Sequence, residues 1–158
     1  MPLPTSITTR LEYQHKTLIE LIEGLSDEQV RRQVMTGKWS IFENLVHLGT
    51  YQHTFSRRID KILNEKDPQF ERYSAESDPL FLDNCSKSTR EAMQDLIASR
   101  REMISKTFSL NDEQLLHKGV HPVFGAMTLK QWVNFFLLHE AHNLFTIFKL
   151  AAEFRKGN

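Results

Sequence analysis

The stretch that decides the fold runs from Ser40 to Leu48 and reads SIFENLVHL. Ser40 and Glu43 have the spacing of a capping box, in which each side chain bonds to the backbone N–H of the other residue at a helix start. The apolar residues that follow recur every three or four positions, which is typical of an amphipathic helix. We therefore predict a helix from Ser40 to about Lys66. Its inward stripe comprises Ile41, Leu45, Leu48, Gln52, Phe55, Ile59 and Ile62.

A second capping box, Thr128-x-x-Gln131, predicts the start of another long helix that runs to about Phe154. This helix is unusual because its apolar stripe contains a histidine and an asparagine. The stripe comprises Trp132, Phe136, His139, Asn143, Ile147, Leu150 and Phe154.

Two more helices complete the pattern. Apolar residues at helical spacing predict a helix over residues 5–25, and a second over residues 86–108. Residues 67–79 mix proline, serine and charged residues without a period, so we expect the longest loop there. Strand signals are nearly absent. Four long amphipathic helices predict an all-α four-helix bundle.

The two halves of the chain echo each other. The first helix is followed by GLSDEQ (residues 24–29) and the third by SLNDEQ (residues 109–114). A turn with glycine, a capping box and a helix with histidines come after each phrase. We interpret this as a degenerate two-fold repeat, which would place the second and fourth helices in related positions. The alternative is that the shared phrase is only a common helix-capping sequence.

The composition limits the classes of function. A length of 158 residues suits one domain, over residues 1–158, and 20 basic residues balance 20 acidic ones. Bulk charge therefore indicates neither a nucleic-acid nor a membrane partner. The lone Cys85 excludes an internal disulfide. The N-terminus has no secretory pattern, and no apolar run could span a bilayer, so we expect a soluble, cytoplasmic protein.

Three histidines are candidate metal ligands. His139 lies within the apolar stripe of the fourth helix, where an unpaired buried imidazole would cost about 1–3 kcal/mol. His142 follows three positions later, a spacing that binds metals in helix bundles. His47 lies on the flank of the second helix, and Glu43, one turn earlier, could accept a hydrogen bond from it unless the capping box occupies that carboxylate.

The other candidate sites are weaker. The spacing of His139 and His142 is one residue short of the H-E-x-x-H zinc-protease motif, which excludes that class. His15 could line the same cavity or simply pack. The remaining histidines, His53, His117 and His121, have no partner at ligand spacing, so we expect them at the surface or in turns. No glycine-rich phosphate loop and no paired core carboxylates are evident, and Cys85 lacks a visible base.

The fourth helix also carries apolar residues on more than one face. It is rich in phenylalanine, at Phe135, Phe136, Phe145 and Phe148, which we expect to form core and dimer surface, so the helix has more apolar surface than one bundle seam can bury. We therefore expect a homodimer that uses this helix.

Two motifs together resemble those of the DinB-like superfamily of metal-binding four-helix bundles. The first is Trp39-Ser40-x-x-Glu43-x-x-x-His47-Leu48. The second reads HPVFGAMTLKQW over residues 121–132 and continues into HEAH over residues 139–142. The resemblance implies an up-down-down-up bundle, often dimeric. It also implies a divalent metal, commonly nickel or zinc, held by one histidine of the second helix and two of the fourth.

Transferred residue by residue, the resemblance assigns His47 and His139 as metal ligands. The family's remaining ligand normally lies four residues after the first histidine of the fourth helix, where this chain has Asn143. Three outcomes remain open: His142 replaces that ligand, the metal keeps an extra water, or the site is vestigial. An asparagine oxygen is a poor ligand for a metal that prefers imidazole.

The resemblance implies a function as well, since characterised relatives include S-transferases that use low-molecular-weight thiols. We predict a metal-dependent enzyme, with a thiol S-transferase or a related detoxification reaction as the expected activity. In this hypothesis His47, His139 and His142 hold the metal, which lowers the pKa of a bound thiol or water. The alternative is a non-enzymatic dimeric bundle, a binding or stress-response protein with a degenerate metal site.

Overall fold

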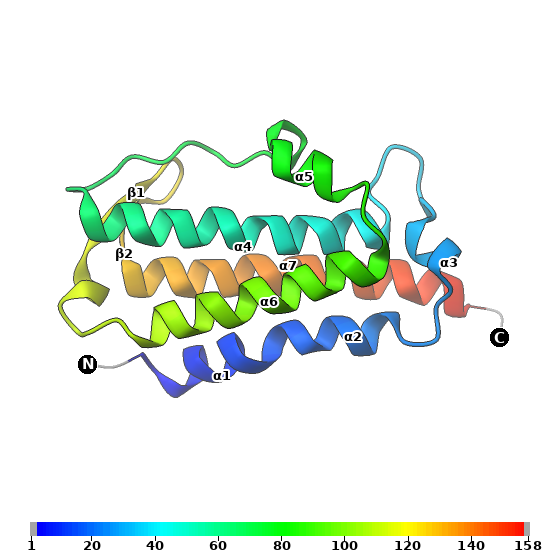
Figure 1. Cartoon of the computed structure of the whole chain (residues 1–158), viewed down its shortest axis with the longest axis horizontal. Coiled ribbons are helices and arrows are strands. Elements are labelled where there is room, and N and C mark those ends of the chain that lie inside the picture. Colours follow the sequence, from blue (N-terminus) through cyan, green and yellow to red (C-terminus); the bar gives the residue numbers. More distant parts are fainter. Residues whose placement is uncertain (1–2, 157–158) are drawn as a thin grey trace.

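The computed structural model describes residues 3–156 and contains four long helical segments packed side by side (Figure 1). The first comprises α1 (Thr5–Tyr13), the 3-10 turn η1 (Gln14–Lys16) and α2 (Thr17–Ile22). The others are α4 (Ile41–Asn64), α6 (Thr89–Phe108) and α7 (Leu129–Arg155). In Figure 1, α4 and α6 run in one direction and the first and last segments run in the other. This is the predicted up-down-down-up order.

Capping boxes begin the three long helices after the first. Ser40 caps α4 with Glu43, and Thr128 caps α7 with Gln131, as the sequence predicts. The third helix begins slightly later than predicted, because the reciprocal bonds form between Ser88 and Glu91.

The predicted first helix, residues 5–25, is not continuous. It tightens into η1 at Gln14–Lys16 and α2 ends at Ile22. The Gln14 side chain donates hydrogen bonds to the carbonyl of Leu137 and to Glu140, each at 2.8 Å, and the Leu11 carbonyl accepts one from Arg100 at 3.3 Å. These contacts with other helices stabilise the tighter turn, and helical periodicity within the segment does not reveal them.

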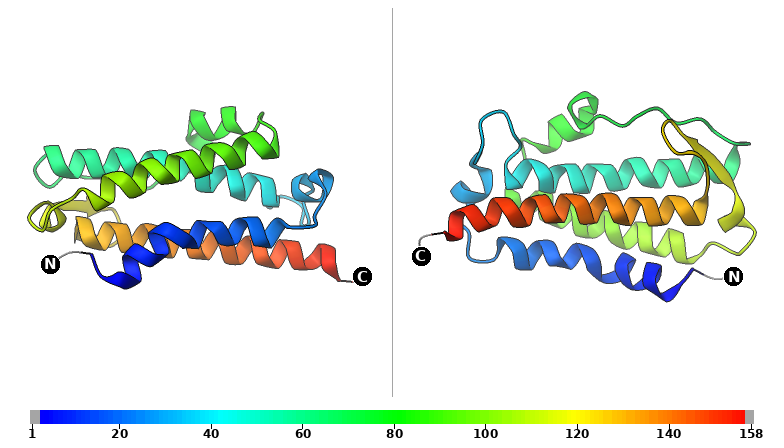
Figure 2. Two further views of the ribbon diagram at one scale, coloured as in Figure 1. Left: turned by 60° about the horizontal axis from the view of Figure 1, so that its bottom comes forward. Right: turned by 180° about the vertical axis from the view of Figure 1, so that it is seen from behind.

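Shorter helices and turns connect the long helices. The helix α3 (Asp27–Arg31) and the 3-10 turn η3 (Gln114–Leu116) begin within the two similar phrases, residues 24–29 and 109–114. Between α4 and α6, the predicted loop is a crossover that carries η2 (Ala75–Ser77) and α5 (Pro79–Asn84) along one side of the bundle (Figures 1 and 2). The crossover matters for function because it forms one wall of the candidate site.

A two-stranded hairpin was not predicted. The strands β1 (Lys118–His121) and β2 (Gly125–Thr128) pair antiparallel, with His121 opposite Gly125. Each strand has only four residues, too short for an alternating pattern to stand out. The crossover also bonds to this hairpin, since the N–H of Phe70 donates to the carbonyl of Val120 at 3.0 Å.

The core consists of two apolar clusters with a polar layer between them. One cluster includes Leu45 and Ile147, and the other includes Phe55 and Trp132. Every long helical segment contributes buried or partly buried polar side chains to the layer at the same height. These are His15, His47, Gln52, Ser99, Arg100, His139, Glu140 and Asn143.

An ion pair lies at the centre of this polar layer. The fully buried Arg100 donates to the Glu140 carboxylate and also, at 2.5 Å, to Gln52. This ion pair was not predicted, because its partners lie on different helices. No helix within residues 3–156 is long and apolar enough to cross a membrane.

Candidate metal centre and its pocket

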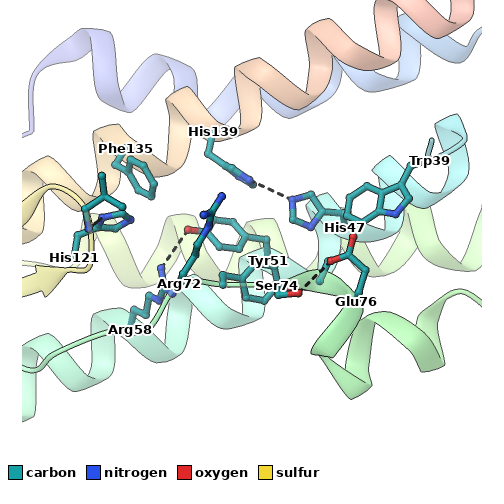
Figure 3. Close-up of a pocket in the computed structure, with 13 residues that line it drawn as sticks. Trp39, His47, Tyr51, Arg58, Arg72, Ser74, Glu76, His121, Phe135 and His139 are labelled. Carbon is teal, nitrogen blue, oxygen red and sulfur yellow. Dashed lines mark hydrogen bonds between the residues drawn. The ribbon is translucent and has the colours of Figure 1, made fainter. Parts of the chain in front are cut away.

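The site begins with two imidazoles that face each other across α4 and α7. Nε2 of His47 lies 3.2 Å from Nε2 of His139, and the two rings are nearly perpendicular, with an interplanar angle of 76° (Figure 3). The two positions are 92 residues apart in sequence. The sequence therefore identified a pair of residues that the fold does bring together.

Asn143 is the third group at this point. Its amide nitrogen lies 3.3 Å from Nε2 of His139 and donates to the carbonyl of His139 at 2.9 Å. A half-turn of the amide about its Cβ–Cγ bond would present the oxygen to the imidazole nitrogens instead. Position 143 thus occupies the place where a third protein ligand would lie.

His142, the third ligand in the sequence-based hypothesis, does not join the pair. Its side chain is exposed and lines a different pocket, beside Lys149 and Glu153. Since an α-helix turns about 100° per residue, position 143 lies about 40° from His139 around the axis and position 142 about 60° on the other side. Only the first of these directions points to the buried stripe. Of the predicted ligands, the structure therefore brings His47 and His139 together and places Asn143, not His142, beside them.

The environment keeps both facing imidazoles neutral. Burial lowers the pKa of His47 from 6.5 to about 4. Burial also lowers the pKa of His139 from 6.5 to about 3, with smaller effects from His47, His142 and Arg58. Neutral imidazole is the form that binds a metal, so both side chains are ready ligands at neutral pH.

The Nδ1 atoms of both rings, which point away from the pair, make no hydrogen bond to the described residues. Both atoms are buried. A metal-bound histidine usually donates its other N–H to a carboxylate or carbonyl. Glu43, the candidate acceptor for His47, accepts from the N–H of Ser40 at 2.7 Å in the capping box. The Glu43 carboxylate therefore caps the helix and does not accept a hydrogen bond from His47.

The residues present fit a divalent metal in part. Two metal–nitrogen bonds of about 2.0–2.1 Å that meet at about 90–110° place their nitrogens about 2.9–3.4 Å apart. The observed 3.2 Å between the Nε2 atoms agrees with this separation. Within residues 3–156, however, no group of three or more His, Cys, Asp or Glu side chains could hold a metal. The donor set is two imidazoles and one amide, weaker than three imidazoles.

A pocket of about 690 Å³ opens beside the imidazole pair (Figure 3). Aromatic rings form much of its wall: Tyr51 lies 4.4 Å from His139 and 5.0 Å from Tyr73 between ring centroids, and Trp39 lies 5.2 Å from His47. Glu76 and Ser74, both from the crossover, lie near His47, and the Ser74 hydroxyl donates to the Glu76 carboxylate at 3.1 Å. The candidate metal site at His47 and His139 thus lies beside a cavity large enough for a small organic substrate.

The other end of the pocket is basic. Arg58, Arg72 and His121 line it together with Phe135. His121 lies at the hairpin turn, as expected, where its Nδ1 accepts from the N–H groups of Val123 and Phe124. Its ring also packs 5.0 Å from Phe135 and 5.5 Å from Trp132, at the wall of the pocket. The unpredicted hairpin carries it there. Its pKa is lowered, first by burial and then by the nearby Arg58.

Most of the pocket wall was not predicted from the sequence. Arg72, Tyr73, Ser74 and Glu76 come from the crossover, where no periodicity marks a residue as inward-facing. Only the position of His121 inside the second motif was a signal that could have identified it.

The remaining candidates lie outside this pocket. His15 is buried in the polar layer and does not line the cavity. His117 approaches the carbonyl of Ile62, with its Nδ1 3.3 Å from that oxygen. Cys85 is half-buried, and burial followed by the effect of Glu43 raises the pKa of its thiol, which disfavours the nucleophilic thiolate.

Sequence comparisons identify relatives over most of the chain. The family profile of the DinB superfamily matches residues 10–147. The uncharacterized protein YuaE of Bacillus subtilis (strain 168) is 27% identical over 139 residues, which span 78% of this chain and 83% of YuaE. An Oceanobacillus iheyensis protein named "Putative metal-dependent hydrolase OB0413" is 25% identical over 150 residues, covering 94% of this chain and 85% of that protein.

Solved structures share the fold. YfiT from Bacillus subtilis, described as a probable metal-dependent hydrolase with an unusual four-helix bundle topology, superimposes with a TM-score of 0.80 at 20% identity. The match covers 94% of this chain and 86% of YfiT. An uncharacterized protein from Clostridium difficile 630 gives a TM-score of 0.64 at 12% identity, with 96% of this chain and 94% of that chain covered. These likenesses establish the bundle architecture.

Proposed function

Because this chain belongs to the DinB superfamily, we propose that it is a metal-dependent hydrolase whose metal ion is held by His47, His139 and Asn143. The observation that carries the proposal is the pair of facing, neutral imidazole nitrogens beside a pocket of about 690 Å³. The names given to OB0413 and YfiT support the reaction class. Zinc and nickel are the metals we propose, since both accept imidazole ligands.

A bound divalent cation would supply Lewis-acid chemistry, by polarising a substrate oxygen and lowering the pKa of a water molecule or a thiol. The chain's own side chains orient the substrate and handle protons. Tyr51 is protonated at neutral pH, and burial raises the pKa of its phenol further; its hydroxyl lies beside Arg58 and can donate a hydrogen bond to a bound substrate. Glu76 offers a carboxylate near His47 that can accept a proton.

Thiol S-transfer remains our second candidate on the same residues. It differs from hydrolysis only in the nucleophile, a low-molecular-weight thiol in place of water. The pocket beside the two histidines has room for a small thiol and an acceptor.

Metal content measured on untagged protein tests the proposal most directly. We expect about one zinc or nickel per chain by mass spectrometry of the metal, and loss of that metal in His47→Ala and His139→Ala. His53→Ala, on the same helix α4 but outside the pocket lining, is the matched control and should retain the metal. Metal-free wild type that also fails to bind added zinc or nickel would overturn the metal proposal.

Activity then separates the two reactions. Metal-loaded protein should hydrolyse chromogenic esters, and the His139→Ala variant should not. Turnover only when a thiol and an electrophile are both added would replace hydrolysis by S-transfer. Metal binding without either activity would favour the non-enzymatic alternative.

A further inference from the structure

Two arginines of this chain are buried, and their surroundings differ. Arg100 is fully buried and pairs with Glu140 in the polar layer. Arg58 is 8% exposed, and no carboxylate of residues 3–156 lies within ion-pairing distance of it. Since a buried cation without a counter-charge is costly, an arginine of this kind at a pocket wall favours an anion that comes from outside the chain.

The surroundings of Arg58 hold its guanidinium in place. One nitrogen donates to the carbonyl of Glu71 at 3.0 Å, and the other approaches the hydroxyl of Tyr51 at 3.4 Å. The guanidinium also lies 5.3 Å from the ring centre of Phe70 and 5.5 Å from that of Trp132. These contacts use two of the five N–H donors of arginine, so donors remain for a ligand.

A second cation reaches into the same pocket. Arg72, on the crossover, points toward the space between His121 and His139, as Figure 3 shows. It has no ion-pair partner in the described part of the chain either. The lining contains one carboxylate, that of Glu76, which lies at the opposite end near His47 and accepts from Ser74. The basic end of the pocket is therefore not neutralised by the protein.

Tyr51 connects the basic end with the imidazole pair. Its ring centroid lies 6.0 Å from Cζ of Arg58 and 4.4 Å from the ring of His139. A small molecule with an anionic group at the arginines would therefore extend along one tyrosine ring to the candidate metal centre.

We propose that Arg58 and Arg72 bind an oxyanion group of the substrate, a carboxylate or a phosphate. The reacting bond of the substrate then lies next to His47 and His139. The inference of an oxyanion site depends only on the two arginines. The placement of the reacting bond beside the histidines depends, in addition, on the proposed metal-dependent function. Planar guanidinium groups favour carboxylates and phosphates because they donate paired hydrogen bonds to two oxygens.

Calorimetric titration of metal-free protein tests the oxyanion site. The protein is treated with a chelator to remove bound metal ions and then desalted to remove the chelator, so that the probes meet only the protein. The probes are phenyl phosphate, phenylacetate and, as the neutral analogue, benzyl alcohol. We expect both anions to bind at least about tenfold more tightly than benzyl alcohol, and their ranking distinguishes a phosphate site from a carboxylate site.

Arginine variants locate the binding. Arg58→Met and Arg72→Gln should each weaken anion binding by about 10- to 100-fold, with little change for benzyl alcohol. Arg101→Gln, on the exposed side of α6 and outside the pocket, removes the same charge and should leave binding unchanged. Arg72 is exposed, so its variant keeps the test valid if Arg58→Met does not fold.

Two results would overturn the oxyanion site. One is equal affinity for the anionic and the neutral probes. The other is an Arg72→Gln variant that binds the anions as tightly as the wild type does. Because the titration uses metal-free protein, a chain that binds the anions but no metal would refute the metal proposal and leave the oxyanion site intact.

Discussion

At the scale of single residues, the candidate site depends on which of two neighbouring positions faces the core. Both Asn143 and His142 line the pocket beside Lys149 and Glu153, but Asn143 is 8% exposed and contacts His139, whereas His142 is exposed. The chain has an imidazole at the outward position and an amide at the inward one. If a metal binds here as we propose, an amide at the inward position is a weaker third donor than an imidazole would be.

Replacing Asn143 by histidine should strengthen metal binding. An imidazole in this position adds a nitrogen donor that zinc and nickel prefer to an amide oxygen. We expect Asn143→His to tighten metal binding by about 10- to 100-fold or more. Changes to residues around metal ligands already alter metal affinity by that factor. His142→Ala should change the affinity little. Titration calorimetry with both metals measures this, and a large loss in His142→Ala would restore His142 as the ligand.

Acid should destabilise the protein through His15. Burial, and then the charges of Arg100 and Lys16, lower the pKa of His15 from 6.5 to about 4. The unfolded chain therefore binds this proton more readily, so the stabilising contribution of neutral His15 is present above pH 6.5 and is lost as the pH falls toward about 4. Urea unfolding at several pH values should show a smaller loss for His15→Leu. An identical pH dependence in the variant would contradict this role.

At the scale of elements, the hairpin and the crossover form the pocket together. Gly119 of β1 lies where its neighbours leave no room for a side chain. A Cβ there would come within 2.7 Å of Ile62 and 2.8 Å of Phe70. The carbonyl of Gly119 also accepts from the indole of Trp132 at 3.1 Å. This close approach brings the β1 strand, and with it His121, against α4 and α7.

Gly119→Ala should therefore destabilise the protein. Both close contacts involve well-packed side chains, so we expect a loss of about 1–3 kcal/mol in the free energy of unfolding by denaturant titration. Gly49→Ala is the matched control, since a Cβ at this helical glycine meets Leu96 at an ordinary 3.5 Å. It should be neutral or stabilise the helix by up to about 1 kcal/mol. Equal stability of the two variants would show that the hairpin can shift freely.

At the scale of the whole molecule, α7 carries an apolar seam on its outer face. Leu138, Phe145 and Phe148 are 57%, 58% and 49% exposed, and the exposed Ala141 lies between the first two. These positions recur at the spacing of three and four residues that is typical of paired helices. The seam is the surface on which we base a homodimer.

We expect the purified protein to be a dimer through this seam. Sedimentation at micromolar concentrations should give twice the chain mass, and Phe145→Glu should give a monomer, because a charge in an apolar interface is costly. Phe124→Glu, at the equally exposed tip of the hairpin, is the control and should remain dimeric. A monomeric wild type would refute the dimer.

The sequence by itself determined the four long helical segments and two residues of the candidate metal centre. Capping boxes at Ser40 and Thr128 are local signals, because the bonds join residues three apart. His47 and His139 were likewise visible, since each stands at or beside an apolar stripe and stripes of a bundle face each other. Local periodicity is sufficient wherever a contact follows from the face of one helix.

Only the tertiary structure decided the basic end of the pocket and the ion pair of Arg100 with Glu140. At the basic end, an aperiodic crossover and a short hairpin bring Arg72 and His121 together through bonds between distant segments. In the ion pair, the partners are 40 residues apart on different helices. Such contacts depend on how whole helices and loops pack, which no window of local sequence encodes.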